Sequence, residues 1–456
     1  MKSGAQLGLS KRQLEFIAFG GSIGAGLFLG VGQGIRLAGP GMLLAYATAG
    51  LMVFIVARGL GEMALADGKP DVFLRYTERY IGPMAAFVQG WSYWICCVLI
   101  CMAELTAAAL FMAQWFPNLP GWITEFTGLA LVFAINRSSV RVFGEVEFWI
   151  SLVKIVTIVG FLILGLFLLS GLGGAKIPGA SVSNLWEHGG WLPKGVGGVL
   201  TALPLALFAF GGSELIGIAA AEAETPTRAV PKAINGVLIR LGVFYLGTTA
   251  VLLCLEPWNS VPTDSSPIVQ VLARIGVPAA ANLMNVVLIS AVLSSCNSIL
   301  YAATRTLKVL GAIGGAPGGL AKVNVHGAPE VAGRLIVVVI ALGLISTRFL
   351  PHGVFGLLLT TVAIIALVNW ALFLIANLRF RGRPEAQSRR FATPGAPWSI
   401  YLVLLLIAVT IVIAAFDRDL RLAVVFAAVA MAILTMAARI WSEMRYRRTA
   451  IAAAPR

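Results

Sequence analysis

Long apolar runs fill most of the chain, and glycine, proline and charged residues interrupt them at intervals. A helix needs about 20 apolar residues to cross a bilayer, and most of these runs reach that length. The pattern predicts an all-α polytopic membrane protein with twelve transmembrane helices. The expected spans are 14–38, 41–63, 83–116, 122–136, 147–170, 196–221, 233–255, 277–304, 332–350, 354–377, 397–416 and 420–439.

Glycine-rich stretches interrupt the first and the sixth of these spans. They read Phe19-Gly20-Gly21-Ser22-Ile23-Gly24-Ala25-Gly26-Leu27-Phe28 and Phe208-Ala209-Phe210-Gly211-Gly212-Ser213-Glu214. The two stretches occupy matching places if spans one to five and six to ten form two repeats. An odd number of helices in each repeat inverts the second copy in the membrane. Interrupted spans at matching places indicate the binding site of a transporter.

The repeats divide the chain into seven predicted segments. Direct sequence similarity between the two halves is weak, so the division rests on the number of spans and on the two breaks. The segments are a cytoplasmic N-terminus at 1–13, a first repeat at 14–171 (helices one to five), an extracytoplasmic loop at 172–195, a second repeat at 196–378 (helices six to ten), a cytoplasmic loop at 379–396, two further helices at 397–440 and a cytoplasmic tail at 441–456.

Composition excludes two other classes of protein. With 59% hydrophobic and 12% charged residues and a mean hydropathy of +0.89, the chain fits neither a soluble globular protein nor a disordered one. The net charge of +14 comes from 34 basic and 20 acidic residues. Basic residues gather in the cytoplasmic loops of membrane proteins, so we expect contacts with membrane lipids and no nucleic acid or obligatory protein partner.

The distribution of basic residues predicts the orientation. With both termini cytoplasmic, few of the 34 basic residues lie in the outer connections. This asymmetry places the N-terminus and the C-terminus inside the cell. The basic residues on the outer side are Arg36, Lys176, Lys194, Arg274, Arg348, Arg418 and Arg421.

Cysteine and histidine positions predict no disulfide framework, no metal site and no cofactor. Every cysteine lies inside an apolar run, and every histidine falls in a predicted loop, without the spacing of metal ligands. No apolar core precedes Leu14, so no cleavable signal peptide is expected. The residues are Cys96, Cys97, Cys101, Cys254, Cys296, His188, His326 and His352.

Backbone breaks at membrane depth supply binding groups. Irregular backbone is tolerated there only where it lines a cavity or is buried in protein. The start of a half-helix exposes N–H groups that bind a carboxylate, and the end of another exposes C=O groups that bind an ammonium. Two such breaks suit a zwitterion such as an amino acid. Close helix packing is the alternative role for Gly24 and Gly26.

Two charged residues stand inside apolar runs. Glu104 lies roughly 18 Å along its helix from Phe116, so it either contacts the substrate amine or carries a proton. The alternative for Glu104 is a protonated acid that hydrogen-bonds a neighbouring helix. Lys154 lies about 10 Å along its helix from Glu147. It either carries the coupling proton or extends its side chain to the inner interface.

Other polar and aromatic residues near the breaks have two interpretations each. Glu214 either lines the inner cavity or caps free backbone N–H groups. Phe208 and Phe210 either pack or close over a ligand. The stretch Ser294-Ser295-Cys296-Asn297-Ser298 in the eighth span predicts interhelical hydrogen bonds ahead of substrate contact.

Together these stretches resemble the bacterial amino-acid permeases of the amino acid–polyamine–organocation superfamily, in its amino acid transporter branch. The likeness runs from about Lys11 to the last helix. The matching stretches are FGGSIGAGLFLGVG at the first break, GLGEMA from Gly59, GWSYW from Gly90, MAELTAA from Met102, FGEVEFWISLVKIV from Phe143, FAFGGSELIGIAAAEAETP from Phe208, AVPKAI from Ala229 and LSSCNSILYAATR from Leu293.

The resemblance implies a leucine-transporter-type fold, a 5+5 inverted repeat with two C-terminal helices added. It assigns substrate binding to the two breaks, an aromatic gate to Phe208, and to Lys154 the place that a sodium ion takes in related folds. Glu214 is expected to contribute to gating. The implied substrate-binding residues are Ser22, Ile23, Gly24, Ala25, Gly26, Phe208, Ala209, Phe210 and Gly211, and the position of Glu104 inside an apolar run adds it to this set.

The chain departs from the branch at three places. Ala25 stands where the branch usually has threonine, which removes a hydroxyl from the carboxylate site. The loop 67–73 replaces the usual Pro-Val-Ser-Gly-Ser-Phe pattern near the inner gate. Ala221 stands where many members have glycine. The first departure affects substrate preference, and none of the three argues against transport.

These observations predict a proton-coupled amino-acid symporter of the bacterial inner membrane rather than an enzyme. Helices one, two, six and seven are expected to rock against the rest, and the proton is the coupling ion. Apolar surroundings of the breaks favour a neutral α-amino acid. One alternative is an amino-acid or polyamine exchanger without proton coupling. A membrane-embedded enzyme or channel is a more remote alternative, because Glu104, Lys154 and Glu214 form no cluster at adjacent helical spacing.

Overall fold

The computed structural model of the chain is all-helical over the residues that it describes. Those are 23–66, 73–138, 140–172, 178–211, 226–263, 265–274, 278–324, 327–349, 354–388, 391–418 and 420–453. The α-helices are α2 (Val31–Ala38), α3 (Met42–Ala66), α4 (Phe73–Tyr80), α5 (Pro83–Ala113), α6 (Gly121–Asn136), α7 (Val140–Ser170), α8 (Gly195–Ala209), α10 (Pro226–Ile239), α11 (Thr248–Leu255), α12 (Pro267–Arg274), α13 (Pro278–Ala312), α14 (Glu330–Ser346), α15 (Val354–Arg381), α16 (Trp398–Phe416) and α17 (Arg421–Ala453).

Shorter helical turns complete the secondary structure. Two are π-helical, and π turns recur at functional sites. They are η1 (Gly26–Gly30) and η5 (Arg240–Gly247); the 3₁₀ turns are η2 (Gly39–Gly41), η4 (Val182–Leu185), η6 (Gly318–Ala321), η7 (Thr347–Phe349) and η8 (Pro384–Ser388).

Within the described ranges, nine helical segments are long and apolar enough to cross a membrane, and two shorter apolar helices are α6 and α8. The segment Gly26–Ala66 joins two of the expected spans through the turn at Gly39, whose φ is +61°. The prediction of an all-α polytopic protein is therefore confirmed. The count of twelve spans and the inverted repeat remain predictions.

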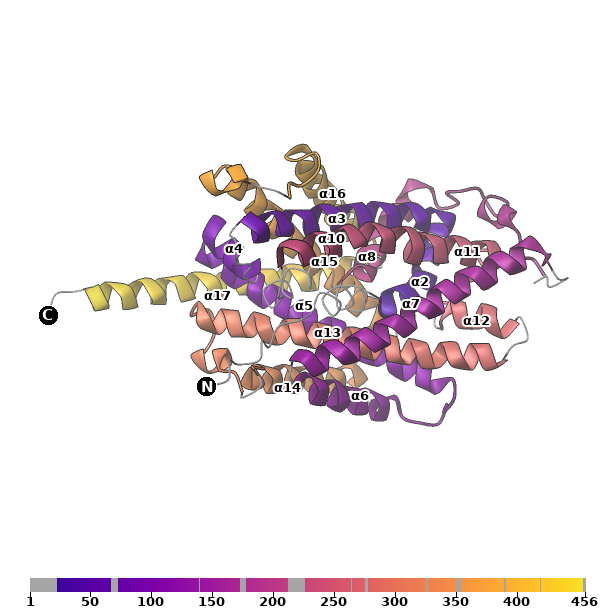
Figure 1. Cartoon of the computed structure of the whole chain (residues 1–456), viewed down its shortest axis with the longest axis horizontal. Coiled ribbons are helices and arrows are strands. Elements are labelled where there is room, and N and C mark those ends of the chain that lie inside the picture. The colour runs from indigo at the N-terminus through magenta and orange to yellow at the C-terminus, as the bar shows by residue number, and fades with distance from the viewer. Residues whose placement is uncertain are drawn as a thin grey trace.

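Several helices run beyond their apolar spans on the predicted inner side. The helix α7 begins at Val140 rather than 147, and α17 ends at Ala453 rather than 439. The extension of α17 contains arginine, glutamate and alanine, which are good helix formers, so its backbone stays helical after the sequence turns polar. In Figure 1 the C-terminal part of α17 projects past the other helices.

The helices pack in two groups that share one long helix. One group contains α2, α3, α8 and α10, and the other contains α5, α6, α13 and α14. The helix α15 contacts both groups through α3, α8 and α5. In Figure 1, α3 and α10 run along the upper side, α6 and α14 lie along the lower side, and α7 crosses in front. The interface between the groups is where the two glycine-rich stretches lie.

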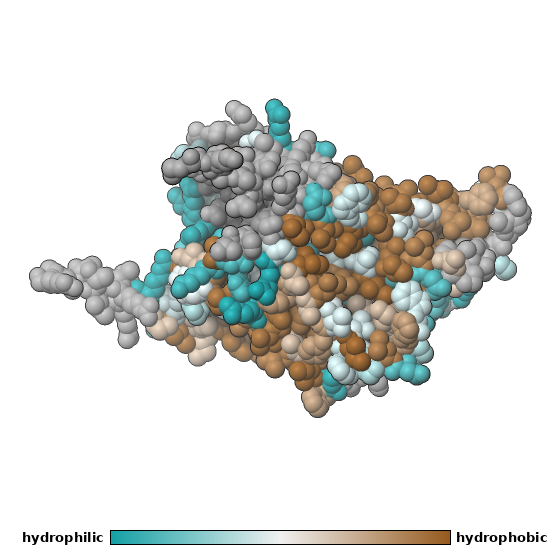
Figure 2. Space-filling model, turned by 60° about the horizontal axis from the view of Figure 1, so that its bottom comes forward, coloured by the Kyte–Doolittle hydropathy of each residue, from teal (hydrophilic) through white to brown (hydrophobic). Residues whose placement is uncertain are grey.

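The outer surface is broadly apolar, as expected for a protein in lipid. Figure 2 shows a wide hydrophobic area over one side of the molecule. On α7, Trp149, Val156 and Ile163 are exposed at seven-residue spacing, whereas Glu147 and Lys154 are buried at the same spacing on another face. This helix therefore turns its apolar face outward and its charged face into the protein.

Candidate functional site

The first glycine-rich stretch changes backbone conformation at Ile23 and Gly24. These two residues form a bend, helical structure begins at Ala25, and the π turn η1 follows. Ser22 lies outside the described residues. A helix start at this position leaves backbone N–H groups without partners in their own helix. The bend thus lies where the sequence predicts backbone N–H groups for anion binding, and that role stays a prediction.

The second glycine-rich stretch contains the end of α8. The helix stops at Ala209, and Phe210 and Gly211 form a turn. The Phe210 N–H donates to the Leu207 carbonyl at 3.1 Å, and the Gly211 N–H donates to the Phe208 carbonyl at 2.9 Å. Glu214 and Ala221 lie outside the described residues, as does most of the 67–73 loop.

The two stretches lie side by side. A Cβ atom built on Gly26 would stand 2.6 Å from the Cα of Ala209 and 3.0 Å from a ring carbon of Phe208. Real Cβ atoms essentially never approach backbone that closely, so this contact requires glycine at position 26. Segments separated by more than 180 residues therefore meet through their backbones in the interior of the protein.

Glu104 of α5 reaches the first bend directly. Its Oε2 accepts the N–H of Ala25 at 2.9 Å, and its Oε1 accepts the hydroxyl of Ser295 at 2.8 Å. The residue is 3% exposed. A Cβ atom on Gly24 would stand 2.2 Å from the Glu104 Oε1, so any larger residue at position 24 would displace the Glu104 carboxylate from this position. The Glu104 carboxylate thus accepts a hydrogen bond from the Ala25 N–H, which the resemblance assigns to the substrate carboxylate.

An aromatic cluster holds the end of α8. The Tyr245 hydroxyl, on the π turn η5, donates to the Ala209 carbonyl at 2.6 Å. The rings of Phe210 and Tyr245 lie 4.2 Å apart between centroids, and Tyr46 of α3 contacts both rings. The carbonyls of Phe208 and Ala209 therefore both accept hydrogen bonds already. Since a carbonyl oxygen has two lone pairs, each retains acceptor capacity for a ligand.

Lys154 is fully buried and points into the protein. Its Nζ donates to the Ser294 hydroxyl of α13 at 2.9 Å. The alternative in which its side chain extends to the inner interface is therefore wrong. The hydroxyl of Ser294 in turn donates to Oε1 of Glu147, and Asn297 Nδ2 donates to Oε2 of Glu147 at 3.3 Å.

Glu147 is the residue of this network that the sequence analysis left without a role. It marked only the inner part of the fifth span, although it is 0% exposed in the structure. The spacing of seven residues places Glu147 and Lys154 on nearly the same face of α7, and that signal could have revealed the pair. The expected interhelical hydrogen bonds of the Ser294–Ser298 stretch are confirmed.

Adjacent serines of α13 connect two clusters. Ser295 bonds to Glu104 at the first bend, and Ser294 bonds to Lys154 and Glu147 on α7. The structure therefore brings together the two intramembrane charges that the sequence singles out, Glu104 and Lys154, on either side of one helix. Among the described residues, no three metal-binding side chains come together.

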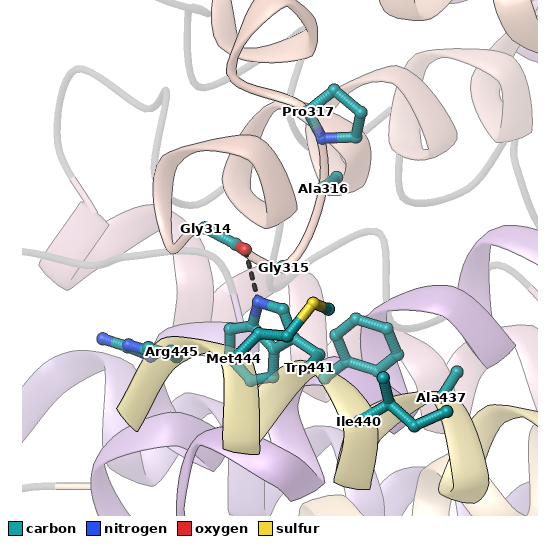
Figure 3. Close-up of a pocket in the computed structure, with 10 residues that line it drawn as sticks. Gly314, Gly315, Ala316, Pro317, Ala437, Ile440, Trp441, Met444 and Arg445 are labelled. Carbon is teal, nitrogen blue, oxygen red and sulfur yellow. Dashed lines mark hydrogen bonds between the residues drawn. The ribbon is translucent and has the colours of Figure 1, made fainter. Parts of the chain in front are cut away.

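A cavity of about 780 Å³ lies away from these breaks, between α17 and the chain that follows α13. Figure 3 shows Trp441 of α17 donating a hydrogen bond to the Gly314 carbonyl within it. The lining is mainly apolar, with Arg445 at one end. None of its residues belongs to the two breaks, so it is not the amino-acid site that the sequence predicts.

Comparison with known proteins places the chain in a family. The amino acid permease family model matches residues 13–452. The aromatic amino acid transport protein AroP of Escherichia coli O6:H1 is 41% identical over 409 residues, which cover 89% of each chain. The AroP protein of Salmonella typhimurium strain LT2 is 39% identical over 408 residues, again 89% of each chain. An uncharacterized transporter, YdgF of Bacillus subtilis, is 35% identical over 418 residues and 91% of each chain.

These matches extend over nearly the whole chain, and the long apolar helices agree with them. They confirm the resemblance drawn from the sequence stretches at the breaks. The chain is a multi-pass membrane protein that belongs to the amino acid permease family.

Proposed function

We propose that this protein imports a neutral amino acid together with a proton across the bacterial inner membrane. The observation that carries the proposal is the contact of the Glu104 carboxylate with the Ala25 N–H, where two backbone breaks meet. This arrangement places an acid that can gain and lose a proton on a group suited to a substrate carboxylate.

Competition for one N–H group couples substrate binding to protonation in this proposal. While Glu104 is ionised, it holds the Ala25 N–H, and a second carboxylate at the same place meets like-charge repulsion. Protonation of Glu104 removes that repulsion and weakens its hydrogen bond to the N–H. The substrate carboxylate then binds the N–H groups of Ile23, Gly24, Ala25 and Gly26.

The substrate amine binds near the end of α8 in the same scheme. Carbonyls at Phe208, Ala209, Phe210 and Gly211 lie at the negative end of that helix, which favours a cation. Ser22 adds its carbonyl from the first break, and Phe208 and Glu214 contribute to gating. These assignments follow from the family pattern and from the proximity of Gly26 to Ala209 and Phe208.

Alternating access arises from motion of the two helix groups. The breaks belong to the group that contains α2, α3, α8 and α10, whereas Glu104 and Ser295 belong to α5 and α13 in the other group. Rocking of the first group against the second therefore changes the contacts of Glu104 directly. Twelve spans in a 5+5 inverted repeat, with both termini cytoplasmic, complete this scheme.

Aromatic amino acids are the first substrates to test. Two of the relatives named above are described as aromatic amino acid transport proteins. Beside the breaks, Tyr46, Phe210 and Tyr245 form a buried aromatic cluster against which an aromatic side chain packs favourably.

Purified protein in proteoliposomes tests the proposed function. Uptake of labelled phenylalanine is measured with and without an inward proton gradient, and with and without unlabelled substrate inside. Symport predicts accumulation that follows the proton gradient. Obligatory exchange predicts uptake that depends on internal substrate and ignores the gradient, and a channel predicts flux far above carrier rates. Either of the latter results would refute the proposal.

Replacing Glu104 with Gln tests the role of the carboxylate. The amide cannot gain and lose a proton, so gradient-driven uptake should fall by about tenfold or more. The exposed Glu443→Gln variant of α17 is the matched control and should transport like the wild type. Unchanged uptake across pH in the Glu104 variant would assign this residue to packing.

A further inference from the structure

A second buried carboxylate lies beside Lys154. Glu147 precedes it by two turns on α7, about 10 Å nearer the predicted inner side, and is 0% exposed. We propose that Glu147 is a proton-relay residue, which accepts the proton of Lys154 through the Ser294 hydroxyl and passes it toward the cytoplasm. This inference rests on the proposed proton coupling, with Lys154 as the second residue that carries the coupling proton, and it names the inner half of the proton's route.

The hydrogen bonds run in one direction. The Lys154 ammonium donates to the Ser294 hydroxyl at 2.9 Å, and that hydroxyl donates to Oε1 of Glu147. No direct bond between Lys154 and Glu147 is needed, because the serine oxygen both accepts and donates. A hydroxyl between a donor and an acceptor is the geometry that a proton transfer requires.

The transfer balances without any further reactant. One N–H bond of Lys154 breaks as an O–H bond forms on Ser294, and the original O–H bond of Ser294 breaks as an O–H bond forms on Glu147. The lysine becomes a neutral amine and the glutamate a neutral carboxylic acid. Two opposite charges disappear together, so the apolar interior does not disfavour the product.

Polar groups continue from Glu147 toward the inner end of α6. Asn297 donates to Oε2 of Glu147 at 3.3 Å, and Asn136 donates to the Asn297 Oδ1 at 2.6 Å. Asn136 is half-buried and is the last residue of α6, next to Arg137, whose side chain is 56% exposed. Hydrogen-bonded side chains thus lead from the buried carboxylate to Asn136, which neighbours an exposed residue at the inner end of α6.

Charged groups on the surrounding helices define the electrostatic setting. Lys154 interacts electrostatically with Glu147 and with Glu104 of α5. The helix α13 carries Arg305 closer to its inner end, where the guanidinium lies 3.5 Å from the centroid of the Tyr301 ring. The helix α11 carries no charged residue, and the π turn η5 begins at Arg240.

Three variants distinguish a proton-relay role of Glu147 from a role only as the counter-charge of Lys154. Glu147→Gln removes the proton acceptor, Ser294→Ala removes the bridge while keeping both charges, and Ser294→Thr restores a hydroxyl. Ser290→Ala is the matched control, since the Ser290 hydroxyl bonds to the Val287 carbonyl of its own helix. Each variant is reconstituted in proteoliposomes and assayed for gradient-driven accumulation, for counterflow exchange at equal pH, and for the dependence of uptake rate on internal pH.

The relay predicts a specific pattern. Gradient-driven accumulation falls about tenfold or more in the Glu147→Gln and Ser294→Ala variants, while counterflow exchange is retained and the dependence on internal pH is lost. Ser294→Thr regains accumulation, and Ser290→Ala resembles the wild type. Full accumulation in Glu147→Gln or Ser294→Ala would overturn the relay, as would loss of counterflow exchange in both.

The same assays distinguish failure of the proposed proton symport from failure of the relay. If the wild type itself shows no response to the proton gradient, the proposed symport fails. A wild type that responds to the gradient, with variants that respond equally, rejects the relay alone.

Discussion

Glu62 and Glu147 are buried carboxylates that both have cationic partners, but the partners hold them differently. Arg381 of α15 donates from Nη1 to both oxygens of Glu62 on α3, at 2.9 and 2.8 Å. Thr393 adds its N–H at 3.0 Å and its hydroxyl at 2.6 Å. Glu147 instead is linked to Lys154 by the Ser294 hydroxyl, which accepts from the lysine and donates to the carboxylate.

In the proposed mechanism, this difference separates a structural ion pair (Glu62 and Arg381) from a pair that exchanges a proton (Glu147 and Lys154). An arginine does not lose its proton in proteins, and the Glu62 oxygens are bound by several donors at once, so that site keeps its charges. It fastens α3 to α15 and to the loop that contains Thr393. A lysine can release its proton, and the intervening hydroxyl gives that proton a path. The partner of a buried carboxylate therefore indicates its role.

The largest effect on transport is expected when arginine replaces Lys154. Lys154→Arg keeps a positive charge that cannot be released, so gradient-driven accumulation should fall about 100-fold. Lys154→Ala should lose accumulation as well, while some exchange or binding remains. Accumulation and counterflow exchange of labelled phenylalanine in proteoliposomes measure both variants. Full accumulation by Lys154→Ala would remove this residue from the mechanism.

A strong effect on stability is expected when the ion pair of Glu62 and Arg381 is broken. Glu62→Ala leaves Arg381 without its buried partner, which should cost about 3–5 kcal/mol of folding free energy. Thermal unfolding in detergent measures the loss, and the uptake that remains should keep the wild-type dependence on pH. If the variant kept full stability but its uptake no longer depended on pH, Glu62 would titrate during transport. That result would contradict the assignment of Glu62 and Arg381 as a structural ion pair.

A smaller effect on stability is expected when lysine replaces Arg381. Arg381→Lys keeps the charge but loses the planar guanidinium that bonds to both oxygens, so stability should fall by about 1 kcal/mol. Accumulation should stay close to that of the wild type. An accumulation defect as severe as that of Lys154→Ala would mean that fastening α3 to α15 is itself limiting for transport.

Much of the architecture could be predicted from the sequence, because apolar runs and their interruptions are local signals. The bend at Gly24 and the end of α8 at Ala209 fall within the predicted breaks. Glu104 and Lys154 stood out as single charges in apolar surroundings. The polar stretch 294–298 also stood out as a source of interhelical hydrogen bonds, but the residues that it would contact did not.

The sequence patterns do not indicate which helices pack against each other, and the contact partners depend on that packing. The bond from Tyr245 to the Ala209 carbonyl joins segments 36 residues apart, and the bond from Ser294 to Glu147 joins segments 147 apart. Such contacts depend on how the helices pack, and single-sequence patterns carry little of that information. Glu147 was hidden for a further reason, because it lies near Glu145 at what looked like the polar end of a span.

The neighbouring positions of Ser294 and Ser295 have a mechanical consequence. Consecutive residues of an α-helix point about 100° apart, so these two hydroxyls serve different carboxylates from a single rigid rod. In the proposed cycle, Glu104 and the Lys154–Glu147 pair therefore share one rigid support, so a variant that displaces α13 should disturb both sites together.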